Sequence, residues 1–143
     1  MSFDLQLYKG DLKITKDGKI SVVTKNSKLR QDIVKILLTQ KSSIKYHPNY
    51  GSNLGALKVG HYADERLMNM DLTASAQTAI RNLMSLQKAQ ARRQLLSPAE
   101  IIVDIKSIKV ERDMSDPRLY NIFISVLTQA FSEITESITI RLI

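Results

Sequence analysis

Two pairs of carboxylates are the residues of this chain whose types and spacing could support catalysis. Glu100 and Asp104, and likewise Glu111 and Asp113, could lie on one face of a strand. Hydrolysis of a glycoside uses two carboxylates held about 5–10 Å apart across a cleft. Alternate strand positions are also where solvent-facing charges normally lie, and no aromatic sugar platform accompanies these pairs. The sequence therefore gives a carboxylate-pair enzyme only weak support.

The sequence gives even less support for a metal site or a catalytic nucleophile. His47 and His61 are the two histidines, and no carboxylate stands near them at the spacing of a zinc ligand set. The chain has no cysteine, which excludes disulfides and thiolate ligands. Its five glycines are isolated, so there is no Gly-rich phosphate loop, and no nucleophile elbow is present. We expect no metal, no cofactor, no small-molecule substrate and no catalytic residue.

The positive charge lies mainly in the first third of the chain. The net charge is +7, and residues 9–45 contain ten Lys or Arg against three Asp. Such a segment could bind nucleic acid, an anionic membrane surface or an acidic protein. Between residues 9 and 45 no aromatic side chain is available for base stacking, and no nucleic-acid-binding signature is visible. A solvated face or an acidic protein partner fits better, and a basic nucleic-acid-binding domain is the alternative function.

A segment without sustained periodicity runs from Gln40 to Gly60. A segment of this length inside a compact domain is usually functional or held by a partner. Two interpretations of its tyrosines, Tyr46 and Tyr50, stay open: they close the loop over the core, or they belong to a subunit interface, where Tyr is enriched. Gly51 is explained by a turn with positive φ. We expect one ordered conformation, fixed by Pro48, Tyr50, Gly51 and Leu54.

Turn and periodicity signals predict a hairpin and then two helices. Phe3, Leu5 and Leu7 alternate with polar residues, which suggests a short strand. Asp17-Gly18 separates the β-type runs 11–15 and 19–23, and Asp-Gly between such runs is typical of a β-hairpin. Helical spacing predicts a helix to about Thr39, capped at residue 26 or 27. A longer helix is predicted from about Ala63 to Leu95, with an apolar stripe of Leu67, Met70, Ala74, Ile80, Leu83 and Met84.

The last third of the chain is predicted to be β-structure. The apolar phase slips at Lys106-Ser107, which predicts a β-bulge, and Ser115-Asp116-Pro117 predicts a turn. The next strand has an inward face of Tyr120, Ile122, Ile124, Val126 and Ala130. The final alternation places four apolar side chains on one face up to the C-terminus: Ile134, Ile138, Ile140 and Leu142.

This final strand lacks the usual protection of an edge. After Glu136 it has no Lys, no Pro and no bulge, the devices that normally blunt a free edge. Two interpretations stay open: the strand pairs inside its own sheet, or it leaves an edge that a partner occupies. The whole pattern predicts a single α+β domain over residues 1–143. Its N-terminal β-hairpin is followed by two helices, one of them long, packed on a mainly antiparallel sheet formed with the C-terminal strands.

The order of elements resembles a known family over residues 26–131. A helix ending in Leu37-Leu38-Thr39 is followed by Pro48-x-Tyr50-Gly51-Ser52-x-Leu54, a long helix and a β-hairpin. This order is similar to the lysozyme-like baseplate wedge proteins of contractile phage tails, which have relatives in type VI secretion. Two features depart from the family. Gln40-Lys41 stands where relatives carry Gly-Glu, and residues 96–100 keep the proline of a Glu-Pro-Arg signature without its flanking charges.

The resemblance implies a structural subunit of the virion tail baseplate, assembled in the host cytoplasm. The chain shows no secretory signal pattern and no apolar run of membrane-spanning length. The implied partners are other wedge proteins and the tail sheath protein, whose assembly this family initiates by exchanging strands with the C-terminal sheet. Arg92 or Arg93 could replace the missing signature charge. The predicted interface residues are Tyr46, Pro48, Tyr50, Gly51, Leu54, Arg92, Arg93, Pro98, Ile134, Ile138, Ile140 and Leu142.

Overall fold

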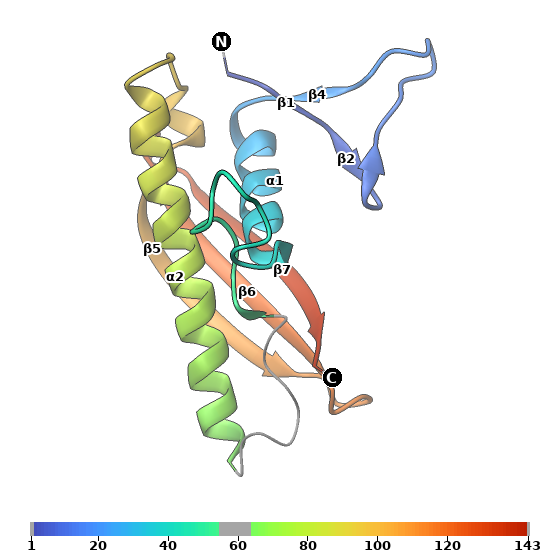
Figure 1. The fold of residues 1–143 in the computed structure, drawn as a ribbon, viewed down its shortest axis with the longest axis vertical. Coiled ribbons are helices and arrows are strands. Elements are labelled where there is room, and N and C mark those ends of the chain that lie inside the picture. The colour runs from blue at the N-terminus through green and yellow to red at the C-terminus, as the bar shows by residue number, and fades with distance from the viewer. Residues whose placement is uncertain (1, 55–63, 143) are drawn as a thin grey trace.

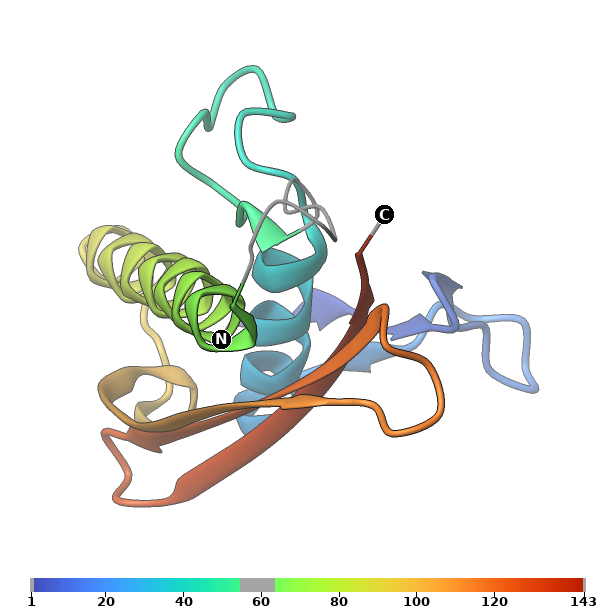
Figure 2. The same cartoon turned by 90° about the horizontal axis from the view of Figure 1, so that it is seen from below.

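The computed structural model describes residues 2–54 and 64–142 of the chain. They form an α+β fold of two layers, in which both long helices cover the same face of a three-stranded antiparallel sheet (Figures 1 and 2). The predicted fold class and the N-terminal hairpin are confirmed. In chain order the elements are β1 (Asp4–Leu5), β2 (Leu7–Tyr8), β3 (Asp11–Leu12), β4 (Val22–Val23), α1 (Lys25–Leu38), α2 (Glu65–Ala91), the 3₁₀ helix η2 (Pro98–Glu100), β5 (Ile102–Arg112), β6 (Leu119–Thr128) and β7 (Glu133–Arg141).

The sheet has the order β5-β6-β7, so β6 is central and the C-terminal strand β7 is an edge. Between β5 and β6 the register shifts twice, between Ile102 and Asp104 and between Ile105 and Ser107. The second shift leaves Lys106 as the extra residue and confirms the predicted bulge. Between β6 and β7 the register is continuous from Leu119↔Arg141 to Leu127↔Glu133. The two edges of the sheet therefore differ: β5 is irregular and β7 is regular.

The helices divide the inner face of the sheet between them, with α1 against β7 and α2 against β5. The core gathers the apolar stripe of α1, that of α2 and the inward residues of the strands. Most of the predicted strand face is buried, but Ala130 lies in the exposed turn after β6 and does not belong to it. None of the described helices combines the length and the apolar character needed to cross a bilayer.

The face that α2 buries differs from the predicted stripe. Leu67 and Met70 are largely exposed, and Ala74 is exposed as well. The residues that pack on the sheet are Met68, Leu72, Ala76, Ala79, Ile80, Leu83 and Gln87. Small alanines suit this face because they let the helix approach the sheet closely. The predicted start at Ala63 lies outside the described residues, and the helix ends at Ala91, before the predicted Leu95.

Residues 2–23 form an N-terminal arm that leaves the two-layer body beside α1 (Figure 1). The predicted turn is present, since Gly18 N donates to Thr15 O over 3.0 Å, and Ile14 bridges Ile20. The arm forms two short ladders of its own, β1-β4 and β2-β3. At their junction three backbone amides close a ring: Gln6 N donates to Ser21 O, Ser21 N to Lys13 O, and Lys13 N to Gln6 O, over 2.8–2.9 Å. This ring gives the arm a defined shape without a large core.

Candidate protein interface

The backbone of β7 presents a row of outward-facing polar groups along its outer edge. At one end Thr128 N donates to Ser132 O, and at the other Leu142 N donates to Arg118 O. Because hydrogen-bonded pairs alternate along an antiparallel ladder, the even-numbered residues of β7 bond to β6. The amides and carbonyls of the odd-numbered residues therefore face away from the sheet: Glu133, Thr135, Ser137, Thr139 and Arg141.

The side chains predicted for this interface lie in the core. Ile134, Ile138, Ile140 and Leu142 are all buried, at 1–8% exposure. They pack under α1 and against β6, so their alternation reports a buried face and not a contact surface. The strand pairs with β6 inside its own sheet on one side and is an edge on the other, and occupation of this edge by a partner stays a prediction. The part of β7 that a partner could contact is its backbone.

The two sheet edges are unequal as docking sites. The edge strand β5 is interrupted by its two register shifts, and Asp104 Oδ1 accepts a hydrogen bond from the Ile105 amide over 2.8 Å. The two bulges prevent an added strand from keeping register along β5. The edge of β7 has a continuous register over its whole length. Strand addition is therefore favoured at β7.

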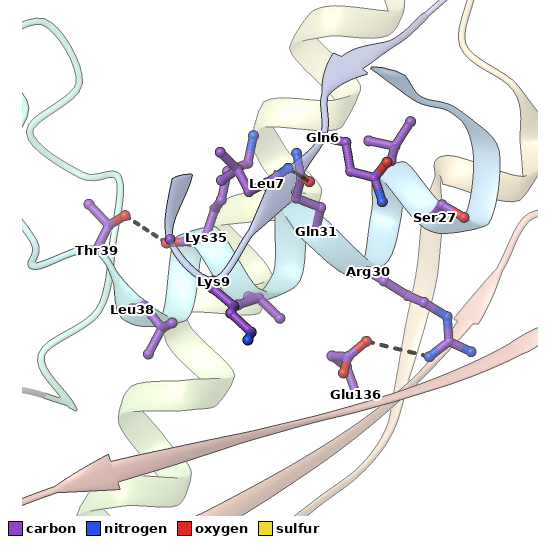
Figure 3. A pocket seen from close by; sticks show the side chains of 13 residues that line it. Gln6, Leu7, Lys9, Ser27, Arg30, Gln31, Lys35, Leu38, Thr39 and Glu136 are labelled. Atoms are coloured by element: carbon purple, nitrogen blue, oxygen red, sulfur yellow. Dashed lines mark hydrogen bonds and ion pairs between the residues drawn. The ribbon is translucent and has the colours of Figure 1, made fainter. Parts of the chain in front are cut away.

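A groove opens beside this edge, and we call it the edge groove. It has a volume of about 570 Å³ and lies between the N-terminal arm, the outer face of α1 and Glu136 of β7 (Figure 3). Leu7 and Leu38 give it exposed apolar surface. Its cations are Lys9, Arg30 and Lys35, and its only lining carboxylate is Glu136. Sequence reasoning missed Arg30 and Glu136, because two residues 106 positions apart give no local signal.

Part of the basic charge is neutralised inside the protein. Lys35 forms ion pairs with Asp4 and Asp32, and Lys28 pairs with Asp32 over 3.0 Å. Burial raises the pKa of Asp4, but hydrogen bonds from Lys35 and Gln31 outweigh burial, and the pKa lies below its ordinary value. The Lys35 contact thus fastens the start of the arm to α1. The lysines at the tip of the arm have no ion pair within the described residues.

The arm carries eight exposed large apolar side chains, more than any other segment of the described chain. They are Phe3, Leu5, Leu7, Tyr8, Leu12, Ile14, Ile20 and Val22. Lys9 and Lys13 lie near the Tyr8 ring, 5.4 and 6.0 Å from its centroid. A surface that combines apolar and cationic groups in this way suits an acidic protein partner. The nucleic-acid alternative stays a prediction.

The aperiodic loop is ordered through its described part and is tied to the end of α1. Ser52 Oγ donates to Leu37 O over 2.5 Å, Ser52 N to Thr39 O over 2.9 Å, and Lys41 N to Ser52 O over 3.0 Å. Leu54 is buried in the core. The remainder of the predicted segment, residues 55–60, lies outside the described residues.

The two tyrosines of the loop have different surroundings. Tyr50 packs on the core, and burial raises the pKa of its phenol. Tyr46 is 82% exposed and lines, with Pro48, a surface pocket of about 420 Å³ against α2. Asn82 of α2 donates to Asn49 O over 3.1 Å at the same place. Tyr50 closes the loop over the core, whereas Tyr46 is free to contact a partner.

The positions that replace the Glu-Pro-Arg signature lie at the other end of α2. Arg92, Arg93 and Pro98 are exposed, and no ion pair fixes the two arginines within the described chain. Glu100 is only 2% exposed and lies 4.0 Å from Lys28 Nζ. The buried Gln87 braces this region, since its Nε2 donates to Glu100 O over 2.7 Å and its Oε1 accepts from Ile102 N over 2.9 Å. Nothing in the sequence pattern identified this brace.

The candidate catalytic side chains are held in structural contacts. Glu111 pairs with Lys109 over 2.5 Å on β5. Asp113 accepts hydrogen bonds from the Ser115 side chain and amide and from the Asp116 amide, and they lower the pKa of its carboxyl. His47 is exposed in the loop, and His61 lies outside the described residues. Across residues 2–54 and 64–142, no cluster of three or more His, Asp or Glu could hold a metal ion.

The fold is found in a protein of known structure. The chain aligns with a "putative tail lysozyme" from Geobacter sulfurreducens with a TM-score of 0.57 and 12% identity, covering 80% of this chain and 88% of the other. No family model matches the sequence, and no curated protein matches it. At this identity the likeness establishes a shared fold and no more.

Proposed function

We propose that this protein is a structural subunit of a contractile tail baseplate, which packs in the wedge and initiates sheath assembly through β7. The observation that carries the proposal is that β7 is a regular edge strand with outward backbone groups beside the edge groove. A strand from a sheath subunit would pair with the outward groups of this edge. Main-chain hydrogen bonds would supply affinity, and alternate side chains would set the register. The shared fold with a protein named for a tail supports this reading, as does the order of motifs along the chain.

Three further surfaces are proposed to contact other proteins. The apolar and basic N-terminal arm is proposed to bind an acidic surface of a neighbouring wedge protein. Arg92, Arg93 and Pro98 are proposed to provide a second contact at the far end of α2, where the related signature lies. Tyr46 and Pro48 offer a third surface on the loop. The α2 and loop surfaces are separate from β7, whereas Leu7 and Lys9 of the arm also line the edge groove. One copy could therefore be fixed in the wedge through the α2 and loop surfaces while it presents its edge to the sheath.

Substituting Thr139 by proline is expected to reduce sheath initiation by more than about tenfold while the domain stays folded. The Thr139 amide faces away from β6, so proline removes no bond of the ladder, but it removes a donor of the free edge. Losing one main-chain hydrogen bond and adding a steric block accounts for an effect of about this size. The measurement is the fraction of baseplates that carry sheath in electron micrographs.

The matched control is Thr139→Val. Both variants lose the bond from Thr139 Oγ1 to Asn121 Oδ1, but only valine keeps the outward amide. Thermal unfolding of the two purified variants checks that both are folded. Sheath of normal length and abundance on Thr139→Pro baseplates would rule out strand addition at β7.

We further propose that the protein has no glycosidase turnover. Glu100 is buried beside Lys28, and Glu111 is paired with Lys109, so neither supports the pair of carboxylates across a cleft that this chemistry uses. Purified protein is expected to clear a peptidoglycan suspension no faster than buffer. Cleavage that disappears in Glu100→Gln or Glu111→Gln would contradict this.

A further inference from the structure

We propose that Glu136 guards the middle of the β7 edge, and that a partner strand carrying a carboxylate enters beyond it and takes its place on Arg30. This inference rests on the proposed strand addition at β7. It names the chemistry of the partner segment: an extended strand with an acidic residue facing α1. It also names the event that must accompany binding, which is the release of Glu136 from Arg30.

The guard acts on the backbone groups that an added strand would use. Arg30 Nη1 donates to Thr135 O over 2.8 Å, and the Ser137 amide donates to Glu136 Oε1 over 3.3 Å. Thr135 O and Ser137 N are consecutive outward groups on either side of Glu136, and in an antiparallel addition they pair with the new strand. Arg30 and Glu136 also contact each other, with 3.4 Å between Nη1 and Oε2. One ion pair therefore occupies two adjacent positions of the edge.

The remainder of the edge is accessible. Within the described residues, the outward amides and carbonyls of Thr139 and Arg141 have no hydrogen-bond partner. A strand can therefore begin to pair at the C-terminal half of β7 without disturbing Arg30. For pairing to continue to Ser137 and Thr135, the side chains of Arg30 and Glu136 must break their hydrogen bonds to the backbone. Because the Arg30 side chain is 48% exposed and on the surface, this opening needs no change in the core.

The edge groove explains why the incoming strand should be acidic. Its lining cations are Lys9, Arg30 and Lys35, and Lys35 is already neutralised by Asp4 and Asp32. When Glu136 leaves, Arg30 and Lys9 face the groove with no carboxylate among its lining residues. A carboxylate from the partner would restore the lost pair, and guanidinium and carboxylate groups match each other geometrically. An apolar residue at an alternate position would meet Leu7 and Leu38.

The replacement of Glu136 by a carboxylate of the partner also explains how the edge selects its partner strand. A strand without an acidic residue would have to break the Arg30–Glu136 pair and leave Arg30 without a partner. Inward-pointing charges on an edge are a known protection against wrong pairing, and a matching charge on the right partner removes that barrier. The β7 edge therefore disfavours pairing with a second copy of β7 or with a neutral strand, and it favours pairing with an acidic strand.

The test compares the two members of the pair in sheath initiation on assembled baseplates, with the sheath subunit of the same tail supplied at limiting concentration. Glu136→Ala removes the guard and leaves the recognition cation, so initiation should become several-fold faster. Arg30→Ala removes the cation that binds the incoming carboxylate, so initiation should fall about tenfold, as for the loss of one charge-assisted bond. The effects have opposite signs, which a merely structural ion pair would not give.

Control variants are available on the opposite edge of the sheet. Lys109 and Glu111 form an exposed pair on β5, and Lys109→Ala and Glu111→Ala should leave initiation unchanged. Exposed pairs contribute little to stability, so all four variants should fold, which thermal unfolding checks. If Arg30→Ala does not fold, Arg30→Gln replaces it with the same expected loss.

The possible outcomes separate this inference from the proposed function. If Thr139→Pro blocks initiation while the Arg30 and Glu136 variants match the β5 controls or change in the same direction, the guard is wrong and strand addition stands. If Thr139→Pro has no effect, the proposed function itself fails. Opposite signs for the two variants, together with a block by Thr139→Pro, support both.

Discussion

Replacing Gly51 by valine is expected to destabilise the protein by about 2–6 kcal/mol, a large share of the roughly 5–15 kcal/mol that stabilises a domain. Gly51 has φ +109, a conformation that residues with side chains rarely adopt. A Cβ atom there would lie 2.5 Å from Thr39 O and 2.9 Å from Lys41 N. Backbone strain costs about 1–3 kcal/mol, and overpacking against a fixed backbone costs about as much again. Urea denaturation measures the change.

Gly18→Val is the control for this experiment. Gly18 also has a positive φ, +75, but a Cβ atom there meets nothing within 4 Å. This control should show the strain alone, about 1–3 kcal/mol, because the turn at the tip of the arm is open. Equal shifts of the urea midpoint in the two variants would mean that the short contacts at Gly51 do not add to the destabilisation.

The effect of Gly51→Val should extend to the edge groove. The backbone that the valine would displace is the end of α1, where Thr39 and Leu38 line the groove. Partial recovery of folding at low temperature should therefore still leave sheath initiation impaired. The loop is thus part of the frame that holds the interface.

The sequence predicted well those features that depend on neighbouring residues. The alternation of β7, the bulge at Lys106 and the turn at Gly18 all follow from local rules for pleat, register and turn geometry. The division into two helices and a C-terminal sheet follows from periodicity in the same way. These signals fix which face of each element is apolar.

Local patterns do not determine what each face meets in the folded protein. On α2 the sequence predicted Leu67 and Met70 inside, but they are exposed, whereas Met68 and Leu72 are buried. Ile80 and Leu83 of the predicted stripe are buried as expected. In the first half of the helix Leu and Met residues occur on more than one face, so periodicity alone does not decide which face is buried. The burial of Glu100 was not predicted, because its partner Lys28 lies on a different element.

Local sequence patterns predict the contact surface of β7 even less well than the buried face of α2. The apolar residues of β7 gave the clearest signal in the sequence, and the signal was assigned to contact with a partner. In the structure this signal reports the core, and the contact surface is the backbone between those residues, which has no sequence pattern of its own. Arg30 and Glu136 meet across the fold, so only the structure brings them together.

Deleting residues 137–143 is expected to unfold the domain. Ile138, Ile140 and Leu142 are 7%, 8% and 1% exposed and belong to the core cluster. Removing three such side chains costs roughly 6–15 kcal/mol, which matches or exceeds the whole stability of a domain of this size. Circular dichroism of the purified truncation should show the loss of cooperative unfolding.

The control removes the outward side chains of the same segment and leaves the core intact. Ser137→Ala, Thr139→Ala and Arg141→Ala together should keep a cooperative transition, because these three side chains are exposed. A truncated protein that melts cooperatively near the temperature of the full chain would show that β7 is not needed for the core. In that case α1 would have to bury its apolar stripe without the β7 part of the sheet, which its packing against β7 argues against. Loss of sheath on truncated baseplates therefore cannot test strand addition, and the edge variants at Thr139, Arg30 and Glu136 can.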